Sequence, residues 1–443
     1  MRQLQGFFKV ILTIALLAGV QIYSYGVQVS SWTYFQESYQ SGTGDIIILG
    51  NSNLMKATGV GSLGIPATGI TGISASASLS KIDGNSLFAG MNFTGTIPSF
   101  TFKSLIFSNF IKNISNFDDI IENAAKFRGS VIYFANAGSG MLDFSSFRGQ
   151  TSFQFNSQFT GNRVIVNQST SQAAGGALFV SAVVDAESAA AADVTVTTLN
   201  FHKLDTPKDS SYLGFSNNGV SINNALAQAQ GGALYASGNV NAIVASNHNY
   251  IAEVIFSTVT ANGEGGTSEH SNKINSNYVV ANGANSQAQG GAFFAAGVVA
   301  NADLNANGAN VGSVLVNIYS SNMLFESNNI IARGKNSQAQ GGALFFAGAV
   351  NNSDKEQQLG AVAPSSLSFY GSTVAFYRNY IQAGANNIQV QGGGVFIGGL
   401  VSLGGTPSSG TAKAIFEGSA ISFTQNSLAI NSYSQAQGGG LFI

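Results

Sequence analysis

A paired sequence motif recurs six times in this chain and constrains its fold more than any other feature. Each copy has Phe or Ile followed three residues later by Asn, and then a Gly-Gly pair that precedes a short apolar run. The Phe or Ile stands 16 residues before the first glycine in five copies and 15 in the last, whereas successive copies are 56, 59, 51, 51 and 46 residues apart. A constant unit with a variable spacer predicts a repeating structural unit joined by loops of different length.

The motif residues are the candidate site residues of the chain. The Phe-x-x-Asn residues are Phe159, Asn162, Phe215, Asn218, Ile274, Asn277, Phe325, Asn328, Phe376, Asn379, Phe423 and Asn426. The glycine pairs are Gly175, Gly176, Gly231, Gly232, Gly290, Gly291, Gly341, Gly342, Gly392, Gly393, Gly438 and Gly439. We interpret these residues mainly as structural. The functional alternative is that exposed copies contact a receptor.

The local chemistry of the motif indicates short strands joined by tight turns. A Gly-Gly pair supplies backbone that turns at positive φ and lets neighbouring chains approach closely. The residues after it, such as Ala-Leu-Phe-Val, form apolar runs of strand length. Phe-x-x-Asn is typical of a strand that ends in a residue tolerant of turns. Identical residues at the same place in successive units can stack, so we expect ladders of Asn, Gln and aromatic side chains.

These features predict an all-β protein with a right-handed parallel β-helix, in which stacked units share one core. We expect each repeat of about 50 residues to form two or more rungs. At about 20–25 residues per rung and ~4.8 Å per rung, residues 27–443 would make a rod of roughly 80–100 Å. The alternative is a kelch-like propeller, although Trp32, the one Trp, lies outside every repeat. A prion-like Asn/Gln segment fits the regular apolar runs less well.

Composition excludes several function classes. Charged residues make up 9% of the chain and the net charge is −2, against about 25% charged residues in soluble domains generally. A nucleic-acid-binding protein would show a basic face, so we expect no nucleic-acid partner. The chain has no Cys, which excludes disulfides, zinc–thiolate sites and cysteine nucleophiles.

The chain divides into three regions. Residues 1–26 combine Arg2 and Lys9 with an apolar run shorter than a membrane span, which predicts a cleaved export signal. Residues 27–150 lack the Gly-Gly motif. We expect them to form an N-terminal cap and degenerate first rungs, with strands at 45–49 and 130–134 and a short helix at 118–126. Residues 151–443 form the repeat region. Because the sequence stops inside the sixth copy, we expect the natural chain to continue to an anchor.

Residues that could carry enzyme chemistry are sparse. The three histidines, His202, His248 and His270, fall in the spacers between motifs, where the charged residues also concentrate. Such spacers predict exposed loops. Asp118 and Asp119 are adjacent carboxylates, but one such pair alone is a weak indication of catalysis. The Gly-Gly motifs lack the Lys-Ser/Thr of a phosphate loop. We therefore predict no catalytic residue, no cofactor and no metal site.

The repeated tetrapeptides resemble those of the polymorphic outer-membrane proteins of chlamydiae, and similar repeats occur in surface proteins of some protists. The Gly-Gly-Ala-Leu/Phe pattern stands at residues 175–178, 231–234, 290–293 and 341–344, while Gly392 and Gly438 begin variants with a third glycine. The resemblance implies a β-helical passenger at the cell surface or outer membrane that acts in adhesion to host cells, often through self-assembly. The chain departs from that family in lacking a C-terminal translocator barrel and cysteines.

Together these observations predict an exported cell-surface protein that mediates adhesion or self-association and is not an enzyme. Its expected partners are host or neighbouring cell-surface molecules and copies of itself, with membrane association only indirect or through an anchor beyond this sequence. The alternatives are a β-helical carbohydrate-active enzyme of the lyase or hydrolase kind and a passive structural coat protein.

Overall fold

The computed structural model describes the motif-bearing part of the chain and short strands upstream of it. Downstream of residue 127 the described residues are 128–135, 140–146, 157–167, 172–184, 194–205, 213–240, 249–260, 272–300, 312–351, 364–402, 411–430 and 433–443. Upstream, the described residues are the strands between 27 and 114. Within these residues the secondary structure is all strand and turn, with no helix.

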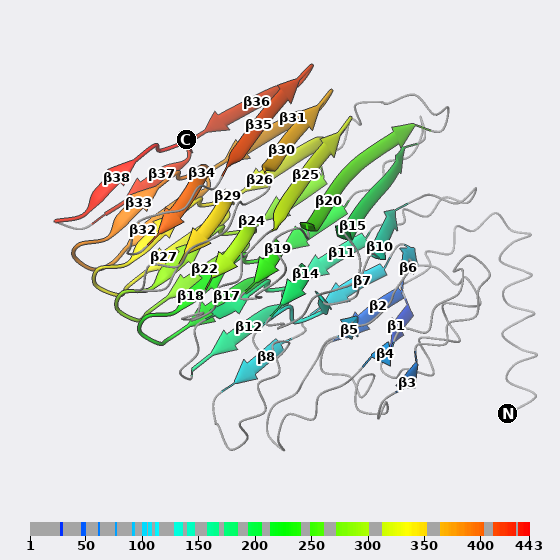
Figure 1. Cartoon of the computed structure of the whole chain (residues 1–443), viewed down its shortest axis with the longest axis horizontal. Helices are drawn as coiled ribbons and strands as arrows, with labels where there is room; N and C mark the ends of the chain where they lie inside the picture. Colours follow the sequence, from blue (N-terminus) through cyan, green and yellow to red (C-terminus); the bar gives the residue numbers. More distant parts are fainter. Residues whose placement is uncertain are drawn as a thin grey trace, which may run out of the picture.

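Each repeat supplies one strand to each of five parallel sheets, which we name A to E in the order in which the chain visits them. In the first full repeat these strands are β11 (Ser157–Thr160), β12 (Arg163–Val166), β13 (Gln172–Ala174), β14 (Leu178–Val184) and β15 (Val194–Asp205). Each strand pairs with its counterparts in the neighbouring repeats, so the strands of one sheet lie side by side along the molecule (Figure 1).

The five sheets have the following strands in stacking order. Sheet A has β1 (Val27–Val29), β2 (Ile46–Leu49), β7 (Leu105–Ser108), β11, β16 (Leu213–Ser216), β21 (Asn272–Asn275), β26 (Asn322–Glu326), β31 (Thr373–Tyr377) and β36 (Ala420–Thr424). Sheet B has β8 (Ile111–Ile114), β12, β17 (Gly219–Ile222), β22 (Tyr278–Ala281), β27 (Asn329–Ala332), β32 (Tyr380–Ala383) and β37 (Ser427–Ala429). Sheet C has β13, β18 (Gln228–Gln230), β23 (Gln287–Gln289), β28 (Gln338–Gln340), β33 (Gln389–Gln391) and β38 (Gln435–Gln437).

The remaining two sheets carry the longest strands. Sheet D has β5 (Met91–Phe93), β9 (Ile132–Ala135), β14, β19 (Leu234–Val240), β24 (Phe293–Ala300), β29 (Leu344–Asn351), β34 (Val395–Ser402) and β39 (Leu441–Phe442). Sheet E has β6 (Phe100–Lys103), β10 (Gly140–Ser146), β15, β20 (Asn249–Thr260), β25 (Ser313–Tyr319), β30 (Ser365–Tyr370) and β35 (Ala412–Glu417).

The strand register shows that one repeat makes one coil. Phe159 of β11 pairs with Phe215 of β16, and Phe325 pairs with Phe376. The prediction of two or more rungs per repeat is therefore wrong, because the five strands and corners of one coil together use all the residues of one repeat. Nine strands stack in sheet A, and at ~4.8 Å per step they span roughly 40 Å. The predicted length of 80–100 Å was too large for the same reason.

The strand pairing excludes the kelch-like propeller. Propeller blades are four-stranded sheets whose strands would pair within one repeat, whereas here every repeat strand pairs in parallel with its counterpart in the next repeat. The single antiparallel pair among the described strands joins β3 (Gly61–Ser62) to β4 (Ser76–Ala77), outside the repeats. The described strands therefore form a solenoid-like stack of coils.

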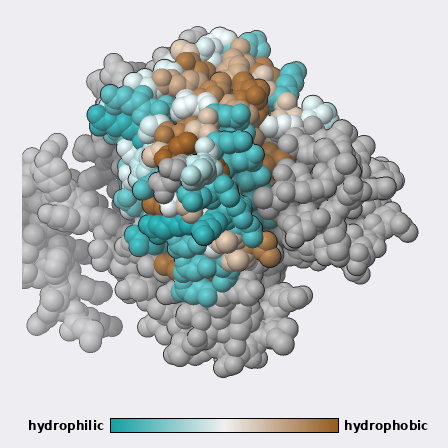
Figure 2. Space-filling model, turned by 90° about the vertical axis from the view of Figure 1, so that its left-hand side faces the viewer, coloured by the Kyte–Doolittle hydropathy of each residue, from teal (hydrophilic) through white to brown (hydrophobic). Residues whose placement is uncertain are grey.

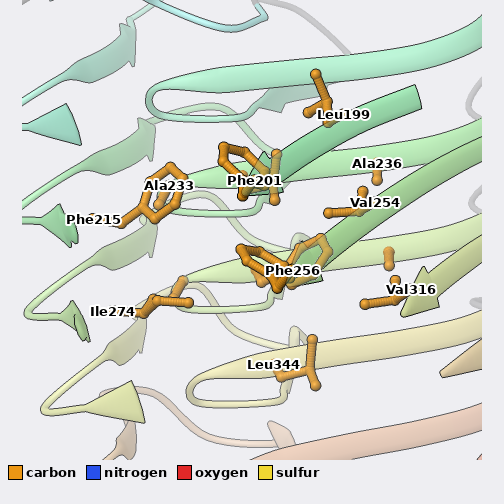
Figure 3. Close-up of a cluster of buried hydrophobic side chains, with 14 of the residues drawn as sticks. Leu199, Phe201, Phe215, Ala233, Ala236, Val254, Phe256, Ile274, Val316 and Leu344 are labelled. Carbon is orange, nitrogen blue, oxygen red and sulfur yellow. The ribbon is translucent and has the colours of Figure 1, made fainter. Parts of the chain in front are cut away.

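The main core lies between sheets A, D and E. Alternate residues of these strands point inward, and Phe201, Phe215 and Leu344 project into it from sheets E, A and D, Leu344 from a later coil than the other two (Figure 3). A second apolar cluster, which includes Val164 and Ala173, lies between sheets B and C. Burying one such Val, Leu or Phe side chain contributes about 1.5–3 kcal/mol, and the contribution recurs in every coil.

The stack of sheets continues upstream of the first motif. The predicted strand at 45–49 is β2, which pairs with β7, and β7 pairs with β11 of the first full repeat. The predicted strand at 130–134 is β9, which pairs with β14. The predicted helix at 118–126 and the predicted export signal at 1–26 lie outside the described residues.

Candidate functional site

The Asn of Phe-x-x-Asn forms a continuous ladder at the corner between sheets A and B. The Oδ1 atom of Asn218 accepts hydrogen bonds from the backbone N and the Nδ2 of Asn162, at 3.0 and 2.9 Å. The Nδ2 of Asn218 donates to Oδ1 of Asn277 at 2.9 Å and to the carbonyl of Phe159 at 2.9 Å. Both amide hydrogens and both acceptor sites are used, which is what burial of a polar group requires.

The residue before each Asn turns the corner in the left-handed backbone region. Gly161, Asn217, Ser276, Ser327, Arg378 and Gln425 have φ between 54° and 69°. This conformation bends the chain from sheet A into sheet B, and the Asn that follows is buried. Asn162, Asn218, Asn277, Asn328 and Asn379 are all 0% exposed. The ladder is thus a buried structural device.

The two glycines of each pair have different roles at the corner between sheets C and D. The first, as in Gly290, has φ +64°, and a Cβ there would lie 2.3 Å from the carbonyl oxygen of Phe293. The second, as in Gly291, is packed against the next coil, where a Cβ would lie 2.0 Å from the carbonyl oxygen of Gly342. Only glycine provides this backbone freedom and this close approach.

Aromatic side chains stack in the same direction as the Asn ladder. In sheet D the rings of Tyr133, Phe179, Tyr235, Phe294, Phe345, Phe396 and Phe442 are stacked without interruption, with centroids 4.6–5.4 Å apart. In sheet A, Phe159 stacks on Phe215 at 4.8 Å and Phe325 on Phe376 at 4.7 Å. Ile274 stands between these two pairs in the register. Stacked rings at this separation add about 0.5–1.5 kcal/mol per pair beyond burial.

Two columns of Gln run along sheet C, and they differ in hydrogen bonding. Gln230, Gln289, Gln340 and Gln391 each donate from Nε2 to Oε1 of the next Gln, at 2.8–2.9 Å. In the other column the contact from Gln287 to Gln338 is 3.4 Å. The Oε1 atoms of Gln228 and Gln287 are buried without a hydrogen-bond partner. The column nearer the glycines is therefore the better satisfied of the two.

Two further corner ladders were missed by sequence reasoning. Between sheets E and A, the backbone N of Ser321 donates to Oγ of Ser372, and that of Ser372 to Oγ of Ser419, at 3.2 and 3.0 Å. Between sheets B and C, the backbone N of Ser286 donates to Oγ of Ser337 at 3.1 Å. Each of these serines follows a residue with positive φ, as each Asn of the main ladder does. The signal was a recurring Ser at a fixed offset from the motif.

The outward-facing carboxylates do not come together in a catalytic arrangement. Glu253 accepts hydrogen bonds from Thr198 Oγ1 at 3.3 Å and Asn317 Nδ2 at 3.2 Å, and Asp143 accepts from Asn200 Nδ2 at 2.8 Å. Within the described part of the chain, no group of three or more His, Asp or Glu residues could hold a metal ion.

The predicted positions of the histidines need one correction. His202 lies within β15, paired with Ser257 of β20, and not in a spacer. The strand extends further than expected because sheet E continues past its buried Phe201. His248, His270, Asp118 and Asp119 lie outside the described residues.

Two tyrosines on the outer faces have shifted acidities. Partial burial raises the pKa of Tyr278 above its ordinary value, and the nearby Arg163 guanidinium opposes part of that effect. The pKa of Tyr319 is also raised, by burial first and then by the neighbouring Tyr370 and the Glu253 carboxylate. Because the pKa of each tyrosine is higher in the folded chain, each reduces the stability of the fold at alkaline pH.

Comparisons of the chain with protein-family models, with curated proteins and with solved structures find no match. Among the described residues no helix has the length and apolar character needed to cross a membrane. The described strands form a parallel β-solenoid, and the repeated motif supplies its corners and part of its core.

Proposed function

We propose that this chain is an exported, non-enzymatic cell-surface protein that mediates adhesion or self-association, with a right-handed parallel β-helix as its scaffold. The resemblance of its tetrapeptides to those of the polymorphic outer-membrane proteins supports this reading. Its partners are host or neighbouring cell-surface molecules and other copies of the chain.

One observation carries the proposal: the recurring side chains are used by the scaffold itself. Phe159 and Asn162 are 0% exposed, and the Asn amides bond to one another from coil to coil. In the first five copies the buried, hydrogen-bonded Asn offers no group with which to contact a receptor, whereas in the last copy Phe423 and Asn426 are partly exposed and Gly438 and Gly439 are exposed. Recognition therefore belongs to the outer faces and to the connections, whose lengths and residues vary between repeats.

The sheet D strands that precede the connections to sheet E end along a single edge of the stack. The last residues of the sheet D strands, among them Val184, Val240 and Asn351, lie in register or next to it in neighbouring coils. The connections themselves, residues 185–193, 241–248, 301–311, 352–363 and 403–410, lie outside the described residues. Repetition along one edge favours multivalent contact, in which several weak contacts give a strong attachment.

The right hand of the helix follows from the general rule for parallel connections. A strand that returns to the same sheet through a crossover does so right-handedly in about 98% of cases. Every circuit here returns to its starting sheet in parallel. Successive coils should therefore rise as a right-handed spiral.

The test compares binding of the purified full chain to a panel of eukaryotic cell lines with binding of a variant whose 301–311 and 352–363 connections are replaced by Gly-Ser linkers of equal length. We expect saturable binding by the natural chain and a large loss in the variant. No binding by either protein, and no self-association in sedimentation, would favour a passive coat protein. Release of reducing ends from polysaccharides would instead indicate an enzyme.

A further inference from the structure

The outer face of sheet B is the most basic surface that the structure describes. Alternate residues of β12 point inward, as Val164 does, so Arg163 and Ile165 lie on the outside. The basic face, as we name it, consists of Arg163 and Tyr278 in the strands of sheet B, Arg378 at the corner with sheet A, and Asn282, Arg333 and Lys335 at the corner with sheet C. Arg333, Lys335 and Arg378 are exposed, and Arg163 and Tyr278 are partly so.

The charges on this face are all of one sign. Of the acidic side chains that the structure describes, Asp143, Glu253 and Glu417 lie on sheet E. Glu326 lies on sheet A, in register with Tyr377, whose ring centroid is 4.7 Å from the Arg378 guanidinium. The contacts of the cations are neutral. Arg333 Nη1 donates to Asn282 Oδ1 at 3.1 Å, and Arg378 Nε donates to Gln425 Oε1 at 2.8 Å. Because neutral partners leave the charge in place, the face keeps a positive potential that can attract an anion.

A column of exposed polar side chains runs along the same face. Asn223 Nδ2 donates to Asn167 Oδ1, and Asn282 Nδ2 donates to Asn223 Oδ1 at 2.5 Å, with Arg333 continuing the column. Figure 2 views this side of the molecule and shows hydrophilic residues gathered in a band among hydrophobic ones. Since coils repeat every ~4.8 Å, the column offers polar groups at regular intervals along the stack. A regular linear array fits a linear polymer better than a small ligand.

Aromatic rings flank this column. The ring of Tyr278 lies over Gly219, whose missing side chain makes room for it, and the Arg163 guanidinium is 5.8 Å from the ring centroid. On the same register row, Tyr380 is 36% exposed. Tyrosines combine an apolar ring face with a polar hydroxyl, which suits contact with the C–H faces and hydroxyls of sugars.

We infer that the basic face binds an acidic linear polysaccharide lying along the axis of the stack. Arg and Lys would meet its sulfate or carboxylate groups, the Asn column its hydroxyls, and the tyrosines its ring faces. This inference rests on the proposed function, because it names the partner class of an exported adhesive protein. The alternative occupant of the basic face is a second copy of the chain, which would pack against it through its sheet E carboxylates.

The experiment measures binding of the purified full chain to three immobilised polymers: heparin for sulfate, polygalacturonate for carboxylate, and dextran as the neutral control. We expect binding to heparin, polygalacturonate or both, absent on dextran and weakened as salt rises. The double variant Arg333→Gln, Lys335→Gln should bind about fivefold or more weakly. The matched control Lys273→Gln, Lys413→Gln removes two exposed cations from sheets A and E and should change binding by less than about twofold.

A variant that is expected to bind more tightly tests whether the weaker binding of the double variant reflects lost charge and not misfolding. Gln382 is exposed on the outer face of β32, so Gln382→Lys should strengthen binding about twofold or more. Equal loss in both double variants, or no binding to either acidic polymer, would overturn the inference. So would salt-sensitive dimers, seen by sedimentation without any glycan, that disappear in Arg333→Gln, Lys335→Gln. Binding to cells without binding to acidic glycans would refute this inference and leave the proposed function standing.

Discussion

Asn277 accepts two hydrogen bonds from Asn218, one from its backbone N at 3.0 Å and one from its Nδ2 at 2.9 Å. The same amide then donates to Asn328 and to the carbonyl of Phe215. One side chain thus joins three successive coils, and its corner is also where the chain passes from sheet A to sheet B.

Replacing Asn277 by Ala should be strongly destabilising. The change leaves two donors of Asn218, its backbone N and one Nδ2 hydrogen, without partners at a fully buried position. It also removes one of the two hydrogen bonds to the Oδ1 of Asn328, and each unsatisfied buried group costs about 1–3 kcal/mol. We expect a lower urea midpoint, equivalent to several kcal/mol of unfolding free energy. The control is Asn329→Ala, which directly follows Asn328 of the ladder and lies on the partly exposed side of β27, and which should change stability by less than about 1 kcal/mol. Similar losses in both variants would contradict the ladder's role.

The second glycine of each of the first five pairs, Gly176 to Gly393, should tolerate no side chain. In Gly291→Ala the new Cβ would lie 2.0 Å from a backbone oxygen of the next coil, so the coils must separate locally. We expect a loss of about 1–3 kcal/mol or more, measured as the thermal midpoint. Gly384→Ala is the control, since its Cβ would meet nothing closer than 3.6 Å. A silent Gly291→Ala would show that the coils can move apart freely.

The corners and the core followed from the sequence because the same residues recur at the same places. The spacing between Phe159 and Gly175 indicated one rigid unit, and that unit proved to be the passage through sheets A, B and C to the Gly-Gly corner. Leu344 and Phe345 are adjacent in β29 and both are buried, because Phe345 belongs to the aromatic stack on the opposite side of sheet D. Adjacent apolar residues in one strand indicated that both faces are covered.

The number of residues per coil could not be read from the motif alone. The strands of sheet E, such as β20, carry no recurring motif of their own. The motif therefore does not predict how long these strands are or where they lie in each coil. The basic face was missed for a related reason. Arg163, Arg333 and Arg378 lie far apart in sequence, and only the register places them on one side of the stack.

Leu226 should be replaceable by Asn with a gain in stability. It has φ +57° and is 63% exposed, whereas the left-handed position of the same corner holds Asn285 and Asn336 in the following coils. Asn adopts this conformation readily, while other L-residues lose roughly 1–2 kcal/mol. We expect Leu226→Asn to raise the unfolding free energy by about 0.5–1 kcal/mol. Leu226→Ala, which keeps the backbone penalty, should not show that gain. A gain of the same size in both would point instead to removal of the exposed apolar side chain.

Tyr278 should make the protein sensitive to alkaline pH. Because its pKa is higher in the folded chain than the ordinary value of 10.0, the unfolded chain loses the proton first as pH rises. The contribution is therefore complete below pH 10 and is lost as pH rises from there through the folded-state pKa. In urea unfolding between pH 8 and pH 11.5, Tyr278→Phe should lose less stability than the natural chain. Tyr433→Phe, at a ring that is 83% exposed, supplies the control and should follow the natural chain. If the unfolding free energies of Tyr278→Phe and the natural chain decrease equally above pH 10, the hydroxyl of Tyr278 does not cause the loss of stability at alkaline pH.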